Sequence, residues 1–517
     1  MAKDYLTEFL PDLKEFREKT MKFHNGELTV AEYKSFSGGF GSYAQRGGQK
    51  HMLRLRMAGG RLTKERLKFI ANSCEKYGID KLKMTTCQSI QLHDLEAADL
   101  CEIIEEAWRA GMISRGGGGD FPRNVMASPL SGVEQGENFD VMPYAEAAGE
   151  YLMNFIKAVK LPRKLKVGFS NSPENSPHAT FRDLGFVSNK DYTFDVYIAG
   201  GLGIKPSLGI CVAKGISPNK ILYYIKAMVN TFTTYGDYEN RSKSRTRFMQ
   251  ESLGAEGLKA AYLEKLEEVL KTEKLDLQIQ ITESHKKGTG QAISDKRLLP
   301  QKQEGLYAVF YQPVGGNLTP QKAAQLYQLI QPMEDVEIRL TPDEGLYIIN
   351  CNSMEAEAVL KATADGARNL FETSVSCVGA AVCQVGIGDS PALLSACVDA
   401  VRRENFADGV LPKIHISGCP SSCGTHQIGA IGFRGGIKQT PDGPKPAFAI
   451  FEGGCQLQGQ EILADMGKSI TVEDIPRFLV ELGRMVSSEN TTYDKWITLH
   501  HDQLEELIEK IYCLATA

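Results

Sequence analysis

Four cysteines in the second half of the chain have a spacing that suits a metal centre. They form two pairs, Cys377 with Cys383 across five residues and Cys419 with Cys423 across three. The second pair is enclosed by Gly418, Pro420 and Gly424. Glycine permits torsion angles closed to other residues, and proline fixes a bend, so this segment can wrap closely around a bulky inorganic core. Because four thiolates hold a cubane cluster at its corners, the pattern favours an iron–sulfur cluster.

Two other interpretations of the four cysteines stay open at this point. Structural zinc usually takes ligand pairs separated by two to four residues, so the five-residue gap between Cys377 and Cys383 counts against it. Free cysteines are also often small buried hydrophobic residues. The regular pairing favours the cluster over both.

The first half of the chain gathers positive charge in several segments. These are Arg54 on a predicted strand, Arg123 after SRGGGGDFP, Lys164 and Lys166 two apart in LPRKLKVGF, and Arg241, Lys243, Arg245 and Arg247 in NRSKSRTRF. Arginine suits oxyanions and carboxylates through its fork, and lysine suits them as a compact charge. The alternative for any one of them is a solvated surface cation. Their number favours a local anion site.

Length and composition limit the classes of function. A chain of 517 residues should divide into two to four domains. With 42% apolar residues, 24% charged residues and a net charge of -5, it is typical of a soluble globular protein and gives no general case for binding nucleic acid or membranes. Twelve cysteines without a dense framework, and an N-terminus without a signal-peptide pattern, predict a cytoplasmic, reduced protein.

A pattern of strand, helix and strand occurs twice. The first copy predicts a strand over 51–57, a helix from Thr63 and a second strand over 81–92. Gly59, Gly60, Leu62 and Thr63 match Gly315, Gly316, Leu318 and Thr319, 256 positions later. A second correspondence, at an offset of 254, matches Val196, Gly200, Ile216 and Ser217 to Ile450, Gly454, Ile470 and Thr471. The chain is therefore predicted to be a duplicated α+β unit with a pseudo-twofold axis.

Taken with the cysteines, seven segments resemble the sirohaem-dependent nitrite and sulfite reductase family. They are MLRLRMAGG, TTCQSIQLH, FPRNV, LPRKLK, RSKSRTRF, CVGAAVC and GCPSSCGTHQIGAIGF, in the order of that family. The resemblance implies that each half is a small ferredoxin-like module plus a larger mixed α/β module, giving three structural domains around a central cofactor. The predicted boundaries are a leader over 1–44, half-domains over 45–115 and 303–368, cofactor domains over 116–282 and 369–517, and a linker over 283–302.

The resemblance also implies roles for individual residues. Cys377, Cys383, Cys419 and Cys423 would bind a 4Fe–4S cluster, and Cys423 would also bridge to the sirohaem iron. Arg54, Arg123, Lys164 and Lys166 would contact the substrate. Lys83, Thr85, Thr86, Gln88, Gln91, His93, Arg163, Arg241, Lys243, Arg245 and Arg247 would hold the carboxylates of the macrocycle. Two positions depart from the family pattern: Cys87 stands where many members have arginine, and Ser421 where many have asparagine.

The resemblance implies a six-electron reductase that acts on sulfite or nitrite. Lys166 favours sulfite, because the family pairs lysine-x-lysine with sulfite, and a dianion calls for more positive charge than a monoanion. Nitrite reduction to ammonia is the alternative. A redox sensor that kept the fold would have lost the substrate cations, and a nucleic-acid binder would need a broad basic face. Because no flavin or nicotinamide module is evident, the electrons are expected from an external ferredoxin or flavoprotein.

Overall fold

The computed structural model describes residues 5–280 and 284–514. By its internal contacts the chain divides into two compact units. Unit 1 comprises 1–201, 207–311 and 317–364, and unit 2 comprises 202–206, 312–316 and 365–517. Each unit is described by itself. The six segments predicted from the sequence are finer than this division, and their boundaries stay a prediction.

Two five-stranded sheets of unit 1 contain the two copies of the first repeat. One has the order β1 (Ser42–Ala44), β2 (His51–Leu55), β5 (Ile90–Leu95), β4 (Leu82–Met84) and β13 (Asn317–Leu318). The other has the order β11 (Leu298–Pro300), β12 (Tyr307–Tyr311), β15 (Leu346–Cys351), β14 (Glu337–Leu340) and β3 (Arg61–Leu62). Each sheet thus takes its last, two-residue strand from the other copy. The α+β fold with a duplicated unit is confirmed.

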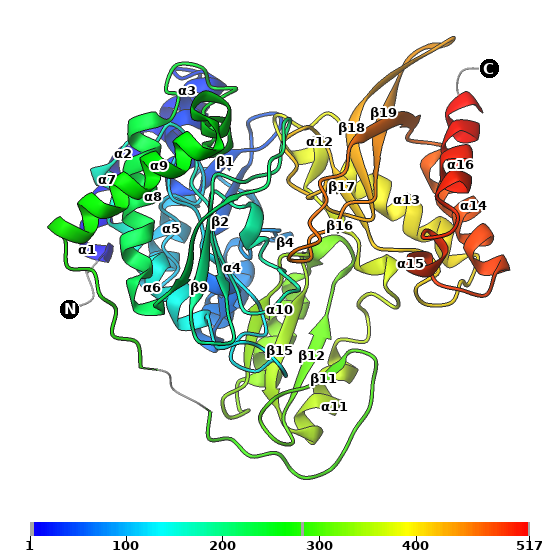
Figure 1. Ribbon diagram of the computed structural model, residues 1–517, viewed down its shortest axis with the longest axis horizontal. Coiled ribbons are helices and arrows are strands. Elements are labelled where there is room, and N and C mark those ends of the chain that lie inside the picture. Colours follow the sequence, from blue (N-terminus) through cyan, green and yellow to red (C-terminus); the bar gives the residue numbers. More distant parts are fainter. Residues whose placement is uncertain (1–4, 281–283, 515–517) are drawn as a thin grey trace. The chain divides into compact units, whose positions relative to one another are not determined.

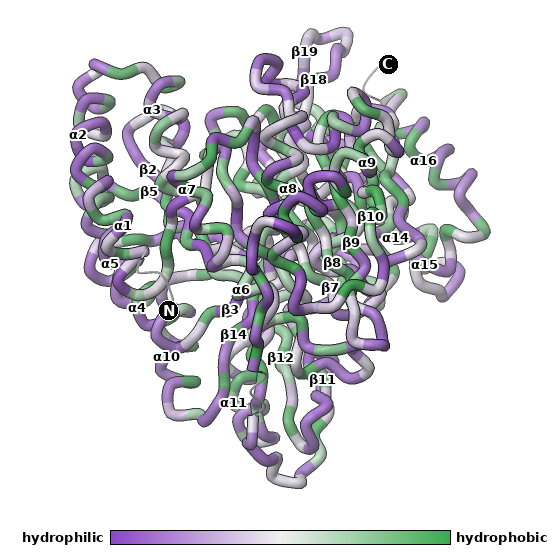
Figure 2. The backbone as a smooth tube through the Cα atoms, turned by 60° about the vertical axis from the view of Figure 1, so that its left-hand side comes forward, coloured by the Kyte–Doolittle hydropathy of each residue, from purple (hydrophilic) through white to green (hydrophobic). Residues whose placement is uncertain are grey.

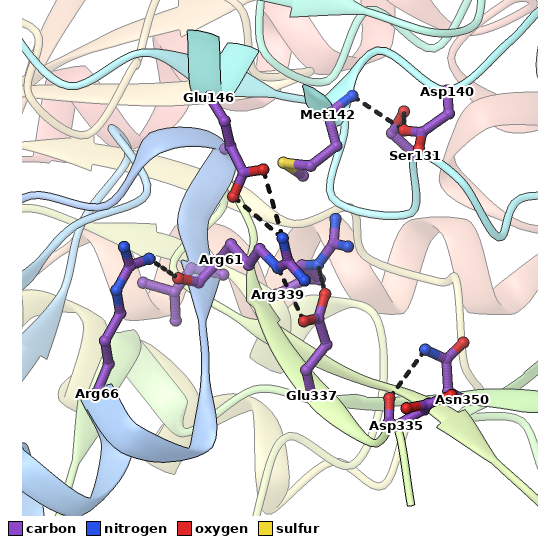
Figure 3. A network of polar contacts seen from close by, with 12 residues as sticks. Arg61, Arg66, Ser131, Asp140, Met142, Glu146, Asp335, Glu337, Arg339 and Asn350 are labelled. Atoms are coloured by element: carbon purple, nitrogen blue, oxygen red, sulfur yellow. Dashed lines mark hydrogen bonds and ion pairs between the residues drawn. The ribbon is translucent and has the colours of Figure 1, made fainter. Parts of the chain in front are cut away.

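The pairing of the exchanged strands follows the repeat. Asn317 pairs with Lys83, and Arg61 pairs with Arg339, both in antiparallel register. Arg61 and Asn317 are 256 positions apart, as are Lys83 and Arg339, so the two exchanges are equivalent. A network of charges covers the second exchange, because Arg61 contacts Glu337 at 2.9 Å and Glu146 at 3.2 Å (Figure 3).

The helices of the two copies begin in the same way. Thr63 accepts a hydrogen bond from the N–H of Arg66 at the start of α4 (Lys64–Tyr77), and Thr319 accepts one from Lys322 at the start of α10 (Pro320–Ile330). A threonine N-cap satisfies a backbone donor that the helix leaves unpaired. The two helices pack against each other over one shared apolar core. Helices α5 (Leu100–Arg109) and α11 (Ser353–Ala362) follow the sheets.

The predicted strand over 81–92 is wrong in one respect, because it forms two strands with a turn between them. In the turn, Thr85 Oγ1 accepts hydrogen bonds from the N–H groups of Cys87 and Ser89. Gln88 has a φ of 52°, in the left-handed region. A side chain that bonds to its own turn competes with a continuous strand. The N-terminal segment forms α1 (Tyr5–Phe9), α2 (Asp12–His24), which begins after Pro11, and α3 (Val30–Ser37).

The second repeat is present once in each unit. Unit 1 has β6 (Met126–Ala127), β7 (Val167–Ser170), β8 (Leu184–Ser188), β9 (Phe194–Ile198) and β10 (Ile210–Ile216). Unit 2 has β16 (Val375–Ser376), β17 (Ile414–Ser417), β18 (Ile431–Thr440), β19 (Gly443–Glu452) and β20 (Met466–Thr471). In both sheets the first three strands are parallel and the last two antiparallel. This shared topology confirms the second correspondence.

Helices cover each of these sheets. In unit 1, α6 (Met142–Met153), α7 (Phe155–Ala158), α8 (Ile221–Tyr235) and α9 (Met249–Thr272) lie beside the sheet, and α8 contacts α9 (Figure 1). In unit 2, the helices are α12 (Gly379–Val382), α13 (Ser390–Arg402), α14 (Ile475–Ser488), α15 (Tyr493–Trp496) and α16 (His501–Leu514). Helices α8 and α14 begin 254 positions apart, in the register of the repeat.

Two further observations concern the β18–β19 hairpin and the apolar character of the helices. The hairpin of β18 and β19 ends in a hydrophilic tip around residues 438–445 (Figure 2). Over residues 5–280 and 284–514, no helix combines the length and the apolar character needed to cross a membrane.

Candidate active site

The four cysteines of unit 2 lie on two loops that are tied together. Cys377 follows β16 and Cys383 ends α12, whereas Cys419 and Cys423 lie between β17 and β18. The N–H of Gly418 donates to Cys377 Sγ at 3.1 Å, and its carbonyl accepts from the N–H groups of Ile387 and Gly388 at 2.9 and 2.8 Å. One glycine therefore bonds to both sides of the first cysteine loop.

The four thiols are the donor type that a 4Fe–4S cluster requires. All four are free cysteines, and burial together with the neighbouring Cys423 raises the pKa of Cys377 to about 11. Within the described residues, no group of three or more His, Cys, Asp or Glu side chains lies close enough to hold one metal ion. A 4Fe–4S cluster does not need several ligands within reach of one ion, because each thiolate binds a different iron. The neighbourhood is tight, since a Cβ on Gly424 would lie 2.0 Å from the carbonyl oxygen of Ile416.

Unit 1 repeats this loop without the thiols. The N–H of Asn171 donates to Ser128 Oγ at 3.0 Å, as the N–H of Gly418 does to Cys377 Sγ. Asn175 and Ser422, 247 positions apart, have φ angles of 47° and 53°. In the same register Ser172 and Ser176 stand where unit 2 has Cys419 and Cys423. The first copy of the loop therefore shares a hydrogen bond and a left-handed backbone position with the second, but has serines at the positions of Cys419 and Cys423.

Two predicted substrate cations converge in unit 1. Arg54 Nη1 and Arg123 Nη1 both donate to the carbonyl oxygen of Gly117, at 2.7 and 2.6 Å. A Cβ on Gly117 would lie 2.8 Å from the carbonyl oxygen of Ser114, so this close approach requires glycine. Burial and the adjacent Arg54 lower the pKa of Arg123 to about 10. Two guanidinium groups held this close create a local field that favours an anion.

The two predicted substrate lysines lie on the segment beside Arg123. The N–H of Arg123 donates to the carbonyl of Leu165 at 2.8 Å, which places Arg123 next to the segment that contains Lys164 and Lys166. The N–H of Lys166 donates to Asp183 Oδ2 at 2.8 Å. Burial lowers the pKa of Lys166, and the charge of Cys87 opposes that shift. The structure thus places Arg123 beside the segment that contains Lys164 and Lys166.

A chain of polar contacts runs from Arg54 into the sheet. The Gln91 amide is assigned with its oxygen toward Arg54 Nη2, at 2.6 Å, and its nitrogen toward His93 Nε2, at 3.1 Å, because only this orientation satisfies both groups. His93 Nδ1 then donates to Gln45 Oε1 at 3.1 Å. Burial lowers the pKa of His93 to about 3, so the ring is neutral and orients Gln91 rather than contributing charge.

Most of the other predicted cofactor cations already contact carboxylates. Asp120 accepts from Arg163 at 2.6 Å and from Arg241 at 2.8 Å. Lys83 forms a buried ion pair with Glu344 at 2.7 Å. Lys243 is exposed, and burial with the charge of Arg245 lowers the pKa of Arg247 to about 10. Thr86 is buried, and Gln88 donates to the carbonyl of Ala127 at 2.9 Å.

Sequence reasoning missed the acidic partners and one cation. Asp183 is fully buried and accepts from Arg245 at 3.0 Å and from the hydroxyl of Thr246. Arg182, beside it, is fixed by the carbonyl of Pro177 at 2.9 Å and by His178 Nδ1 at 2.9 Å. In the sequence, the adjacent pair Arg182 and Asp183 could have indicated these charged residues. Charge counting alone does not reveal which cations are already neutralised.

The residues present fit a polyanionic macrocycle and a cluster. Arg245 Nε is buried without a hydrogen-bond partner among the described residues, although the guanidinium also bonds to Asp183. Burying such a donor without a partner is costly, and a carboxylate from a bound group would satisfy it. The four thiols offer the donor set of a 4Fe–4S cluster. We therefore regard both groups as compatible with the side chains of the respective units.

Comparison with known families gives two matches. The family described as nitrite and sulphite reductase 4Fe-4S domain matches residues 118–270. The nitrite/sulfite reductase ferredoxin-like half domain matches residues 43–107 and again 299–365, which are the two copies of the first repeat.

Individual proteins resemble the chain over most of its length. The chloroplast ferredoxin–nitrite reductase of Spinacia oleracea is 25% identical over 452 residues, covering 84% of this chain and 74% of its own. The ferredoxin–nitrite reductase of Synechococcus elongatus is 26% identical over 462 residues, covering 84% and 85%. The solved structure of the Mycobacterium tuberculosis NirA protein has a TM-score of 0.77 at 21% identity and covers 95% of this chain and 96% of its own. This last likeness supports the fold.

Proposed function

Because the chain belongs to the nitrite and sulfite reductase family, we propose that it reduces nitrite to ammonia, with sulfite as a second candidate substrate. The observation that carries the choice is the match over 84% of the chain to proteins named ferredoxin–nitrite reductases. The sequence-based preference for sulfite rested on Lys166 alone. Sulfite stays the second candidate because both lysines of the predicted pair are present.

The cofactors predicted from the sequence, sirohaem and a 4Fe–4S cluster, are those of this family. When bound, sirohaem supplies an open iron site for the oxyanion, and the cluster supplies electrons to it. We propose that Cys377, Cys383, Cys419 and Cys423 hold the cluster, with Cys423 shared with the sirohaem iron. Orphaned donors such as Arg245 Nε support a role for the cations of unit 1 in binding the macrocycle carboxylates.

The side chains of unit 1 would bind the substrate and supply protons. Arg54 and Arg123, fixed at Gly117, would hold the oxygens of the anion and stabilise charge as these leave as water. Lys166 would release a proton more readily than an exposed lysine, because burial lowers its pKa. Lys164 would add a further positive charge from the same segment.

We propose that the electrons come from a ferredoxin, as the names of the relatives suggest for those proteins. A cytoplasmic location fits the scattered free cysteines, none of which forms a disulfide among the described residues.

Steady-state assays with reduced ferredoxin or methyl viologen test the function. A preparation loaded with both cofactors should form ammonia from nitrite with a higher kcat/KM than it forms sulfide from sulfite. Arg123→Ala should lower both values by about 100-fold, the order seen when one donor to a developing anion is lost. Failure of the loaded protein to reduce either anion would overturn the proposal, and a higher kcat/KM for sulfite would reverse the order of substrates.

A further inference from the structure

Two glycine-rich segments of unit 1, over 38–41 and 116–119, pack backbone against backbone. A Cβ on Gly41 would lie 2.6 Å from the carbonyl oxygen of Ser114, at the start of the second segment. A Cβ on Gly117 would lie 3.1 Å from the Cα of Gly41. Side chains would separate the two segments, so their close contact requires glycine on both sides.

The hydroxyl of Tyr43, in β1, lies between glycines of both segments. A Cβ on Gly38 would lie 2.8 Å from the hydroxyl oxygen, and a Cβ on Gly118 would lie 2.5 Å from it. The N–H of Gly119 donates to the same oxygen at 2.6 Å. The hydroxyl therefore fills a narrow slot and is hydrogen-bonded to the backbone of the second segment.

The loop over 116–119 is thus held at both ends. At its start the N–H of Gly116 donates to the carbonyl of Gly39 at 2.8 Å, and at its end the N–H of Gly119 donates to Tyr43. Between these two points lies the carbonyl that accepts from both predicted substrate arginines. The two hydrogen bonds on either side of this carbonyl set its direction, and with it the position of both guanidinium groups.

We propose that Tyr43 is a positioning residue for the substrate, because its hydroxyl holds the glycine loop so that the carbonyl of Gly117 keeps Arg54 and Arg123 side by side. This inference rests on the proposed function, in which the two arginines bind the anion. The backbone of Arg54 is tied to the same region, since its N–H donates to the carbonyl of Gly41 at 2.9 Å. Tyr43 acts through the loop and the arginines.

The charges at the loop explain why the arginines need such support. Two guanidinium groups that share one acceptor repel each other, so a loosely held acceptor would let them separate. Tyr43→Phe leaves the N–H of Gly119 without its acceptor, which costs free energy. The next residue, Asp120, stays bonded to Arg163 and Arg241, so the loop should loosen without unfolding.

Amide hydrogen exchange measures the hold on the loop without turnover. In the cofactor-loaded protein, peptides covering residues 114–121 should exchange about tenfold faster in Tyr43→Phe, as expected when one backbone hydrogen bond is lost. Tyr262→Phe is the matched control, because it removes a hydroxyl that donates to the carbonyl of Tyr224 at 3.0 Å, between α9 and α8. It should leave exchange of the loop unchanged. Equal exchange in Tyr43→Phe and the natural protein would overturn the inference.

Steady-state kinetics test the effect on the substrate. Tyr43→Phe should raise the KM for nitrite by about tenfold at nearly unchanged kcat, because only the fraction of molecules with both arginines in place binds the anion. A merely structural role would instead leave fewer folded molecules, which lowers the measured kcat and leaves KM unchanged. A lower kcat at the natural KM would therefore contradict the positioning role. Tyr262→Phe should keep the natural KM.

A double-mutant cycle tests whether Tyr43 acts through the arginines. In Arg123→Ala only one arginine is left to position, so adding Tyr43→Phe should raise KM by about threefold instead of tenfold. A full tenfold increase in both backgrounds would show that Tyr43 acts by another route. If the loaded protein reduced neither anion, the proposed function would fail, while the exchange of the loop would still decide whether Tyr43 holds it.

Discussion

At the scale of single residues, buried carboxylates hold the cations of unit 1 in place. Asp183 is the clearest case, because it accepts from the backbone of Lys166 and from the side chains of Arg245 and Thr246 while fully buried. Asp120 does the same for Arg163 and Arg241 nearer the surface, and their hydrogen bonds outweigh burial and lower its pKa. Each carboxylate fixes two cationic segments relative to each other, and so sets the arrangement of the cations that we propose to bind the anion.

Asp183→Asn is predicted to destabilise unit 1 and to slow turnover. The change leaves Arg245 without its charged partner in a buried site, and breaking such a pair costs about 3–5 kcal/mol. We expect a clearly lower Tm by differential scanning fluorimetry and a lower kcat/KM for nitrite, because the amide offers one acceptor oxygen where the carboxylate offers two, so either the backbone of Lys166 or the hydroxyl of Thr246 loses its acceptor. The control is Glu267→Gln in the exposed pair of Glu267 with Lys271, which should leave Tm unchanged. If Asp183→Asn had the same Tm as the natural protein, the ion pair of Asp183 with Arg245 would not be what holds the two cationic segments in place.

His51 gives a pH dependence of stability. It is fully buried, its Nε2 lies 2.8 Å from Nε2 of His24, and burial followed by the charge of His24 lowers its pKa from 6.5 to about 4. The unfolded chain therefore binds more protons than the folded one between these values, and stability is lost as the pH falls from about 6.5 to about 4. The loss from this group is up to about 3 kcal/mol.

Tm measured across this pH range checks the prediction. His51→Asn should show a shallower decrease than the natural protein, whereas His285→Asn, at an exposed position, should not. Identical slopes in all three proteins would contradict the assignment of this pH dependence to His51.

At the scale of elements, the loop after β17 depends on glycines that admit its close backbone contacts. A Cβ on Gly432 of β18 would lie 1.9 Å from the carbonyl oxygen of His426, in the same loop as Cys423. Its counterpart Gly185 of β8 would place a Cβ 1.8 Å from the carbonyl oxygen of Ala179. Both copies of the loop thus fold back over their following strand in the same way.

Gly432→Ala is predicted to displace the cysteine loop and to prevent cluster assembly. The neighbouring atom is backbone and cannot move aside cheaply, so the iron content and the cluster absorption of the purified protein should fall to a small fraction of the natural values. Gly436→Ala on the same strand is the matched control, because a Cβ there meets nothing within 4 Å. Full iron content in Gly432→Ala would mean that the loop tolerates the displacement.

The sequence predicted some elements better than others for physical reasons. The helices α4 and α10 were predictable because a threonine N-cap precedes apolar residues at helical spacing in both copies. The exchanged strands β3 and β13 were not, since two residues carry no periodicity and pair with strands far along the chain. The turn at Gln88 was missed because Thr85 bonds to the turn in a sequence that otherwise alternates like a strand.

For the site, residue types were easier to predict than their pairing. The repeated motifs indicated Arg54 and Arg123, and the structure places both at Gly117. The contact of Lys83 with Glu344 could not be read from the sequence, because the two residues belong to different copies of the repeat.

At the scale of the whole molecule, duplication has produced two loops with one backbone and different ligands. Ser128, Ser172 and Ser176 take the places that Cys377, Cys419 and Cys423 have in unit 2, and the match extends to the hydrogen bond from Asn171. Serine hydroxyls are poor ligands for the iron of such clusters, which select thiolates. The duplicated fold is therefore expected to bind one cluster per chain.

The iron content of the purified protein tests this directly. One 4Fe–4S cluster with one sirohaem gives about five iron atoms per chain, whereas two equivalent sites would give about nine or ten. Cys419→Ser makes the unit 2 loop more like its counterpart and should lower the count to about one or none, because the cluster is lost. Ser172→Ala, at the equivalent position of unit 1, is the matched control and should leave about five. A count near nine in the natural protein, or loss of iron in Ser172→Ala, would show that the first loop also holds metal.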